Sequence, residues 1–284
     1  MSNILSVNNL TKHYKDFTLD NISFAVPYGS IVGLIGENGA GKSTIIKTIT
    51  NVINNDGGNV SMFGNKGTIS VEEKNKLAVV FDGNNFPDVL TVQTLNNVLK
   101  NIYPNWNEEK YFSMISKLDL PRGKKIKDFS KGMKMKLSII VAFSHNANLM
   151  ILDEATSGLD PVVRDDILDI LLDFVQDENN SVLVSSHITS DLEKIADYIV
   201  FIHKGRLVFN LPKDELMHDY GVVKCGEEQF CKLDSTDFIA YRKQDYSYEI
   251  LVSKRDTISK KYPKLAVENA TIDEIMLLYI KGVK

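Results

Sequence analysis

The order of hydrophobic and polar positions near the N-terminus predicts strands that lead into a glycine-rich loop. Ile22, Phe24 and Val26 alternate with polar or small residues, which is the pattern of a strand with one buried face. Residues 30–35 form a continuous apolar run, which is typical of a strand buried on both faces. A glycine-rich stretch follows directly, and residues 43–49 then have a helical pattern.

The middle of the chain, residues 86–145, has helical periodicity, and strands alternate with helices after it. Short buried strands at 149–152 and 181–184 enclose a predicted helix at 165–175, and this order predicts a mostly parallel α/β sheet. Residues 198–203 and 207–210 predict a hairpin. Two apolar helical faces are expected in the middle region, one formed by Val92, Leu95, Val98, Leu99 and Ile102 and the other by Phe112, Ile115 and Leu118.

The pattern changes again after about residue 220. Residues 238–242 and 246–252 predict a second hairpin, and Thr271 with Glu274 has the spacing of a capping box at the start of a final helix. We expect a small, separate α+β unit without a chemical motif, whose helix face is buried on its own hairpin or on a partner chain. The residues expected to share one hairpin face are Tyr246, Tyr248, Ile250 and Val252, and those expected on the helix face are Ile272, Ile275, Met276 and Tyr279.

Composition narrows the class of protein. The 284 residues are 43% apolar and 25% charged, which is ordinary for a globular protein of about two domains. A formal charge of −4 provides no large basic field for nucleic acid or an anionic bilayer. The longest apolar runs are far shorter than the ~20 residues of a membrane span, and the N-terminus has no signal-peptide pattern. Cys225 and Cys231 fit a reducing compartment and have no partners at metal-binding spacing.

The glycine-rich stretch carries the clearest chemical motif. Gly36-Glu37-Asn38-Gly39-Ala40-Gly41-Lys42-Ser43, followed by Thr44, matches G-x-x-x-x-G-K-[ST] in full. Its glycines let successive backbone N–H groups surround phosphate oxygens, and the following helix N-terminus adds positive potential. Lys42 would reach the β- and γ-phosphates, and the Ser43 hydroxyl would ligate Mg²⁺. Because a predicted strand precedes the motif and a helix follows it, the sequence predicts a nucleotide site.

A second motif is the apolar strand at 149–152, which ends in Asp153 and Glu154. An acidic residue at the end of a buried strand can hold Mg²⁺ beside the phosphate loop, and we assign this role to Asp153. The acidic residue after it can orient or deprotonate the attacking water, and we assign this role to Glu154. Two solvated acids would be an equally common interpretation without the loop upstream. The presence of the phosphate loop favours the interpretation that Asp153 and Glu154 act on the nucleotide.

With these motifs the chain resembles the ATP-binding subunits of ABC transporters, over roughly residues 3–218. Phe129-Ser130-Lys131-Gly132-Met133-Lys134 stands where that family has its signature, usually L-S-G-G-Q, and the variant S-K-G-M-K resembles that of small bacterial exporter ATPases. Ser157-Gly158-Leu159-Asp160 resembles the D-loop, and Ser186-His187 resembles the switch-histidine motif. Tyr14 matches the aromatic residue that stacks on adenine.

The resemblance also implies roles for residues outside the phosphate loop. Ser130 and Gly132 would contact the γ-phosphate held by the opposite subunit, and the alternative for Ser130, an ordinary helix N-cap, is compatible with that role. His187 would hydrogen-bond the γ-phosphate and Glu154, and Asp160 would contribute to the nucleotide site. The glutamine position of the Q-loop falls on or near Asp82, whose carboxylate is a possible Mg²⁺ ligand but carries an unfavourable charge if it lies close to the γ-phosphate.

The fold implied is a P-loop NTPase of the α/β class, with a mostly parallel core sheet, an antiparallel N-terminal β subdomain, an inserted helical subdomain and a small C-terminal α+β appendage. Residues 1–218 would form the nucleotide-binding domain, with the helical subdomain at about 86–146, and residues 219–284 an accessory domain. ATP and Mg²⁺ are the implied cofactors, with Glu154, His187 and Lys42 as catalytic residues.

The function implied is ATP hydrolysis that powers an exporter. Its partners would be separately encoded integral-membrane permease subunits and a second ATPase subunit, either a copy of this chain or a paralogue, with no nucleic acid, on the cytoplasmic face of the cell membrane. Two alternatives are a soluble ABC ATPase for macromolecular assembly, such as iron–sulfur cluster delivery, and a nucleotide-gated protein of the ribosome or DNA. Ribosome-associated relatives usually carry two cassettes, and DNA-acting relatives insert long coiled coils or zinc modules. Neither feature is present here.

Overall fold

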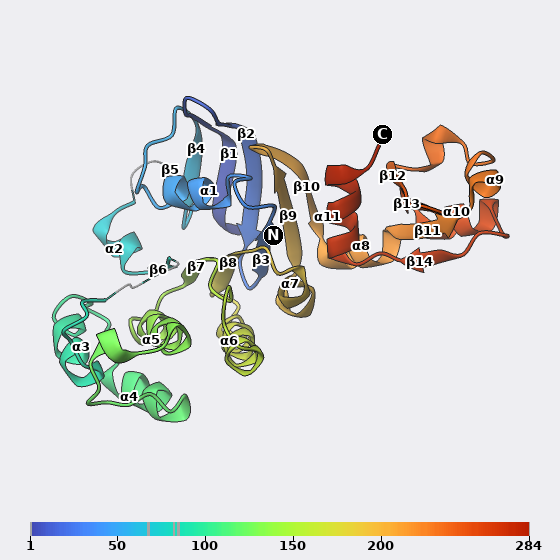
Figure 1. Ribbon diagram of the computed structural model, residues 1–284. Helices are drawn as coiled ribbons and strands as arrows, with labels where there is room; N and C mark the ends of the chain where they lie inside the picture. The colour runs from blue at the N-terminus through green and yellow to red at the C-terminus, as the bar shows by residue number, and fades with distance from the viewer. Residues whose placement is uncertain (1, 67–68, 82, 84–85, 284) are drawn as a thin grey trace.

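A six-stranded sheet forms the centre of the structure, a computed structural model that describes residues 2–66, 69–81, 83 and 86–283 (Figure 1). The strand order is β10-β9-β3-β8-β7-β6, and only the pairing of β10 with β9 is antiparallel. The predicted mostly parallel sheet and the first hairpin are therefore confirmed. Its strands are β3 (Ile31–Ile35), β6 (Leu77–Val80), β7 (Leu149–Asp153), β8 (Ser181–Ser186), β9 (Tyr198–His203) and β10 (Arg206–Pro212).

Both faces of the central sheet are covered, as the continuous apolar pattern of β3 requires. Ile31 and Ile35 belong to the apolar cluster on one face, while Val32 and Leu34 belong to the cluster on the other, because side chains alternate along a strand. Figure 1 shows α5, α6 and α7 on one side of the sheet and α1 with the N-terminal sheet on the other. These helices are α1 (Lys42–Ile49), α5 (Lys131–Ser144), α6 (Pro161–Phe174) and α7 (Thr189–Ile195).

The N-terminal sheet is antiparallel and has the order β2-β1-β4-β5. Ile22, Phe24 and Val26 are buried on one face of β2, which confirms the alternation seen in the sequence. Its apolar face belongs to one hydrophobic cluster with α1 and with one face of the central sheet, and α1 contacts β7 of that sheet. The strands are β1 (Asn3–His13), β2 (Thr18–Pro27), β4 (Gly57–Met62) and β5 (Asn65–Lys66), and α2 (Val71–Lys74) follows them.

The helical region has an apolar core of its own, in which Tyr111 is fully buried and donates a hydrogen bond to the carbonyl of Val92 (3.0 Å). The apolar face predicted for its first helix is wrong at Val98 and Ile102, which are exposed. The helix ends at Leu99, so Ile102 lies beyond it, and only Val92, Leu95 and Leu99 face the core. The elements are α3 (Val92–Leu99), α4 (Glu108–Lys117), a short 3₁₀ turn at Ile126–Asp128 and α5.

A third, antiparallel sheet lies in the C-terminal region, in the order β12-β13-β11-β14. The predicted second hairpin is β12–β13, but Tyr246 does not share its buried face. Tyr246 is 97% exposed because it belongs to the turn, which is closed by a hydrogen bond from Gln244 N to Ser247 O (2.7 Å). The elements are α8 (Lys213–Asp219), β11 (Gly221–Cys225), α9 (Glu227–Phe230), a 3₁₀ turn (Ser235–Asp237), β12 (Ala240–Lys243), β13 (Tyr248–Val252), α10 (Arg255–Lys261), β14 (Val267–Asn269) and α11 (Ile272–Lys281).

The final helix, α11, joins the C-terminal sheet to the central sheet (Figure 1). The predicted capping box of Thr271 and Glu274 is present. Tyr279 of α11 contacts the rings of Phe201 in β9 and Phe209 in β10, with centroids 6.2 and 5.8 Å apart. The helix contacts its own hairpin as expected, but it also packs on α7. The apolar face of α11 is therefore buried both on its own hairpin and on the central domain, whereas the sequence predicted only the hairpin or a partner chain.

Within the described part of the chain, no helix combines the length and the apolar character needed to cross a membrane.

We predict that the α11 contact contributes to the stability of the whole chain. Ile275 is fully buried in the cluster that also covers the central sheet, so Ile275→Ala should lower the free energy of unfolding by about 2–5 kcal/mol. Tyr246→Ala is the control, with an expected change within about 0.5 kcal/mol because its side chain is exposed. Urea unfolding followed by circular dichroism measures both. Equal stability of the two variants would contradict the prediction.

Candidate nucleotide-binding site

The phosphate loop connects β3 to α1, as its motif predicts. Two of its glycines are required by close contacts. At Gly36 (φ 155°) a Cβ atom would lie 2.3 Å from the carbonyl oxygen of Ile202, and at Gly41 (φ 115°) it would lie 2.6 Å from Leu19. A side chain at Gly36 would displace the backbone of Ile202, and one at Gly41 would collide with the Leu19 side chain at a φ that residues other than glycine rarely adopt.

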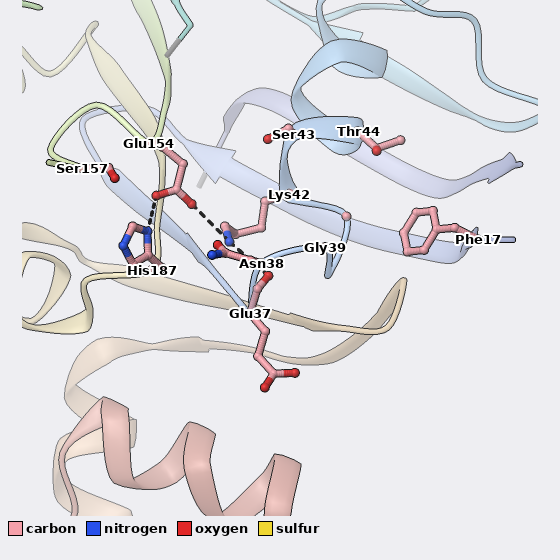
Figure 2. A pocket seen from close by; sticks show the side chains of 11 residues that line it. Phe17, Glu37, Asn38, Gly39, Lys42, Ser43, Thr44, Glu154, Ser157 and His187 are labelled. Carbon is pink, nitrogen blue, oxygen red and sulfur yellow. Dashed lines mark hydrogen bonds and ion pairs between the residues drawn. The ribbon is translucent and has the colours of Figure 1, made fainter. Parts of the chain in front are cut away.

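Lys42 lies inside the loop rather than in solvent. Its side chain is 5% exposed, and its ammonium group donates hydrogen bonds to the carbonyl oxygens of Gly36 (2.8 Å) and Glu37 (3.3 Å). The same Nζ forms an ion pair with Oε1 of Glu154 at 3.2 Å, which is the dashed line between these two residues in Figure 2. A buried cation is thus fixed at the place where the loop would receive phosphate groups.

Glu154 is held between two charged or polar partners (Figure 2). One carboxylate oxygen faces Lys42, and the other lies 2.5 Å from Nδ1 of His187. The backbone at Glu154 has a φ of 53°, an unusual conformation for a residue with a side chain. Its N–H donates to the carbonyl oxygen (3.1 Å) and to Oγ (3.0 Å) of Ser185 on β8, which holds this conformation.

Ser185 is a residue that the sequence did not single out. Besides accepting from the N–H of Glu154, its hydroxyl donates to Oδ1 of the buried Asp153 (2.7 Å), so one side chain orients both acidic residues. The parallel register places Asp153 of β7 opposite Ser185 of β8. The only signal in the sequence for a role of Ser185 was its position just before Ser186 and His187. The pattern of a single strand does not indicate which strand pairs with it, so the contact with Asp153 could not be predicted.

These groups surround a pocket of 370 Å³. His187 and Glu154 lie at one end and Phe17 at the other, with Lys42 between them (Figure 2). The buried ammonium group of Lys42 beside the loop and the aromatic end of the pocket suit a nucleotide whose phosphates lie on the loop. The predicted site residues that line the pocket are Glu37, Asn38, Gly39, Gly41, Lys42, Ser43, Thr44, Glu154 and His187, and Ser157 also lines it.

The aromatic end of the pocket is formed by Phe17, a second residue that the sequence analysis missed. Tyr14, the predicted adenine-stacking residue, does not line the pocket among the described residues, and its ring centroid lies 6.5 Å from that of Phe17. Phe17 also contacts Gly41, where an added Cβ would lie 2.9 Å from its ring. The stacking role of Tyr14 stays a prediction, and Phe17 lies nearer to the phosphate loop.

Ser130, Gly132 and Asp160 are not brought to the described pocket of this chain. Ser130 is the N-cap of α5, where its hydroxyl accepts from Met133 N (3.2 Å), and Asp160 is the N-cap of α6, where its carboxylate accepts from Val163 N (3.0 Å). The Asp160 cap and Pro161 after it start α6 four residues earlier than predicted. Asp82 lies outside the described residues.

The oxygen ligands available suit Mg²⁺ better than a transition metal. Ser43, with a hydroxyl, lines the described pocket, and Asp153, with a carboxylate, does not; α1, which carries Ser43, packs against β7, which ends in Asp153. Among the described residues, no group of three His, Cys, Asp or Glu residues could hold a metal ion. Mg²⁺ needs no such cluster, since it binds through one or two protein oxygens, phosphate oxygens and water.

Comparisons with known proteins agree with this geometry. The family model described as "ABC transporter" matches residues 19–157. The lantibiotic transport ATP-binding protein SrtF of Streptococcus pyogenes is 31% identical, over 74% of this chain and 92% of its own length. The chain belongs to the ABC transporter family of ATP-binding proteins. Members of this family hydrolyse ATP, so the chain is an ATPase.

Two further comparisons extend the assignment. The bacitracin transport ATP-binding protein BcrA of Enterococcus faecalis is 32% identical, over 76% of this chain and 71% of its own length. A solved ATP-binding subunit of an ABC transporter is 28% identical, with a TM-score of 0.66 over 75% of this chain and 91% of that one. The expected ABC ATPase fold is thereby confirmed.

We predict that Lys42 and Ser130 differ in their effect on ATP binding by the isolated subunit. Lys42→Ala should weaken binding about tenfold or more, because one hydrogen bond to a charged group is worth about 1.5–3 kcal/mol. Ser130→Arg should change the dissociation constant less than about twofold, since Ser130 does not line this chain's pocket. Fluorescent ATP titration of monomeric protein measures both, and equal losses would argue that Ser130 acts within its own chain.

Proposed function

We propose that this ATPase is a subunit of an exporter and powers transport through separately encoded integral-membrane permease subunits. The observation that carries the hydrolytic part is the position of Glu154, held between Lys42 (3.2 Å) and His187 (2.5 Å) beside the phosphate loop. A carboxylate fixed at this place can orient a water molecule and accept its proton.

In the proposed mechanism, each group has one task. Glu154 orients or deprotonates the attacking water, while Lys42 and the loop N–H groups stabilise the negative charge that develops on the transferred phosphoryl group. His187 keeps the Glu154 carboxylate in place and contacts the γ-phosphate. Ser43 and Asp153 would hold Mg²⁺, which neutralises phosphate charge when bound.

We further propose that the site is completed by a second ATPase subunit, either a copy of this chain or a paralogue. Neither Ser130 nor Gly132 lines the chain's own pocket, and both lie at the N-terminus of α5, a position suited to an anion. The N-cap role of Ser130 is compatible with this second role. ATP would then hold two subunits head to tail, with Asp160 near the shared site.

Two observations support the proposal that the transporter is an exporter. The signature variant Ser130-Lys131-Gly132-Met133-Lys134 resembles that of small bacterial exporter ATPases, and two relatives are named for transport of a lantibiotic and of bacitracin. We propose that the helical region at about 86–146 docks on the permease from the cytoplasmic face of the cell membrane. Its exposed apolar side chains at Val89, Val98 and Ile102 support such a contact.

We propose that residues 1–218 form the domain that binds and hydrolyses the nucleotide. Residues 219–284 would form an accessory domain, since the pockets described in this region, one beside Tyr262 and one beside Phe230, contain no phosphate loop or paired acid and base. Its packing through α11 gives it a stabilising role as well.

The role of Glu154 is tested by Glu154→Gln, which keeps the shape of the side chain and removes its basicity. Steady-state hydrolysis should fall by about two orders of magnitude or more while ATP still binds. Size-exclusion chromatography with ATP should then show a trapped dimer. Hydrolysis at near the wild-type rate would exclude Glu154 as the base.

The shared site is tested by mixing two inactive variants. Lys42→Ala keeps an intact signature and Ser130→Arg keeps an intact phosphate loop, so a mixed dimer of this chain contains one complete site. Each variant alone should be inactive, and a 1:1 mixture should recover up to roughly a quarter of the wild-type rate, because half of randomly paired dimers are mixed. A mixture that stays inactive would contradict composite sites between copies of this chain.

A further inference from the structure

Helices α6 and α7 begin where the two loops beside Glu154 end. Ser157 lines the nucleotide pocket, and α6 begins at Pro161 after it. His187 contacts Glu154, and α7 begins two residues later at Thr189. The two helices pack against each other on one face of the central sheet. Their relative position therefore sets where His187 stands relative to the 157–160 loop.

A partly buried ion pair joins the two helices close to these loops. Nε of Arg164 in α6 lies 3.8 Å from Oδ2 of Asp191 in α7, and the two side chains are 26% and 4% exposed. A second nitrogen of the same guanidinium donates to the carbonyl oxygen of Leu159 (3.4 Å), within the 157–160 loop. Arg164 thus touches the loop on its own helix and the carboxylate on the next.

The two facing atoms are not satisfied in this arrangement. Arg164 Nε and Asp191 Oδ2 are both buried, and neither has a hydrogen-bond partner among the residues that the structure describes. Buried polar atoms without a partner are rare, and a donor–acceptor distance below about 3.2 Å is needed for a good hydrogen bond. A small approach of α6 to α7 would form this bond, so the pair favours one relative position of the helices.

We propose that Arg164 and Asp191 are positioning residues for ATP hydrolysis, which hold α7 against α6 and thereby keep His187 in contact with Glu154. The inference rests on the proposed roles of Glu154 and His187. Neither Arg164 nor Asp191 lines the described nucleotide pocket, so they act through His187 and not on the nucleotide.

The chain supplies a matched control between the same two helices. Asp165 of α6 and Lys194 of α7 form an ion pair at 2.8 Å, but their side chains are 63% and 58% exposed. Exposed pairs contribute little because water screens them and two long side chains lose freedom. Asp165→Asn therefore removes a charge from the same helix contact without disturbing a buried group.

The test begins with Asp191→Asn, which removes the charge and keeps the size of the side chain. This change leaves the less buried partner, Arg164, without its carboxylate, whereas loss of Arg164 would leave the more deeply buried Asp191 carboxylate without its guanidinium partner. We expect kcat for ATP to fall about tenfold or more, as for a small displacement of a catalytic group, with the ATP dissociation constant changed less than about twofold. Asp165→Asn should leave both values close to wild type.

The decisive measurement repeats the substitution in a His187→Ala background. If Asp191 acts through His187, Asp191→Asn should lower kcat less than about twofold further in that background. A further tenfold loss there would overturn the proposal. A normal kcat for Asp191→Asn beside an impaired His187→Ala would overturn it while leaving the proposed role of His187 intact. A normal kcat for His187→Ala would overturn both.

A second variant covers the case in which Asp191→Asn does not fold, as judged by circular dichroism. Arg164→Lys keeps the charge but cannot reach both the Leu159 carbonyl and Asp191, because an ammonium group lacks the planar fork of a guanidinium. We expect a reduced kcat, with ATP affinity retained and no further loss from adding this change to His187→Ala. A wild-type kcat would assign the pair to folding alone and overturn the proposal.

Discussion

The parallel pairing of β8 with both β3 and β7 is the constraint on which the site depends. The phosphate loop follows β3, the acidic residues end β7, and Ser185 and His187 stand at the end of β8 between them. Because the carboxyl ends of parallel strands meet at one edge, three segments far apart in the sequence converge there. A pairing of β3 directly with β7 would leave no place for the histidine next to Glu154.

Where these three segments meet, a buried charge on Lys42 and an unusual backbone conformation at Glu154 lie close together, and neighbouring groups stabilise each of them. Lys42 is buried, but two carbonyl oxygens and the Glu154 carboxylate surround its ammonium group. Glu154 has a left-handed backbone, which two bonds to Ser185 hold in place. Buried charge and unusual backbone conformation are tolerated only where surrounding contacts determine them, and both occur here around the proposed site of water attack.

Helix α7 links this site to the rest of the molecule. It follows His187, contacts α6 through Asp191 and Lys194, and meets the C-terminal region where the Glu193 carboxylate accepts from Ile272 N (2.7 Å) at the start of α11. A seven-residue helix has little stability of its own, so its position is set by these neighbours. Residues 219–283 therefore contribute to the surroundings of His187 through packing, although the described pockets of this region share no lining residue with the pocket at the phosphate loop.

The sequence alone determined the parallel α/β core, the phosphate loop, the two acidic residues and the capped last helix, because each depends on residues close together in the chain. Only the tertiary structure decided which distant groups meet. The placement of Ser185 opposite Asp153 follows from strand register, and the entry of Phe17 into the pocket follows from the packing of β2 and its loop against Gly41. The packing of α11 on α7, Phe201 and Phe209 could not be predicted from the sequence either. An apolar helix face indicates that the helix must be buried, but it does not identify the element that covers it.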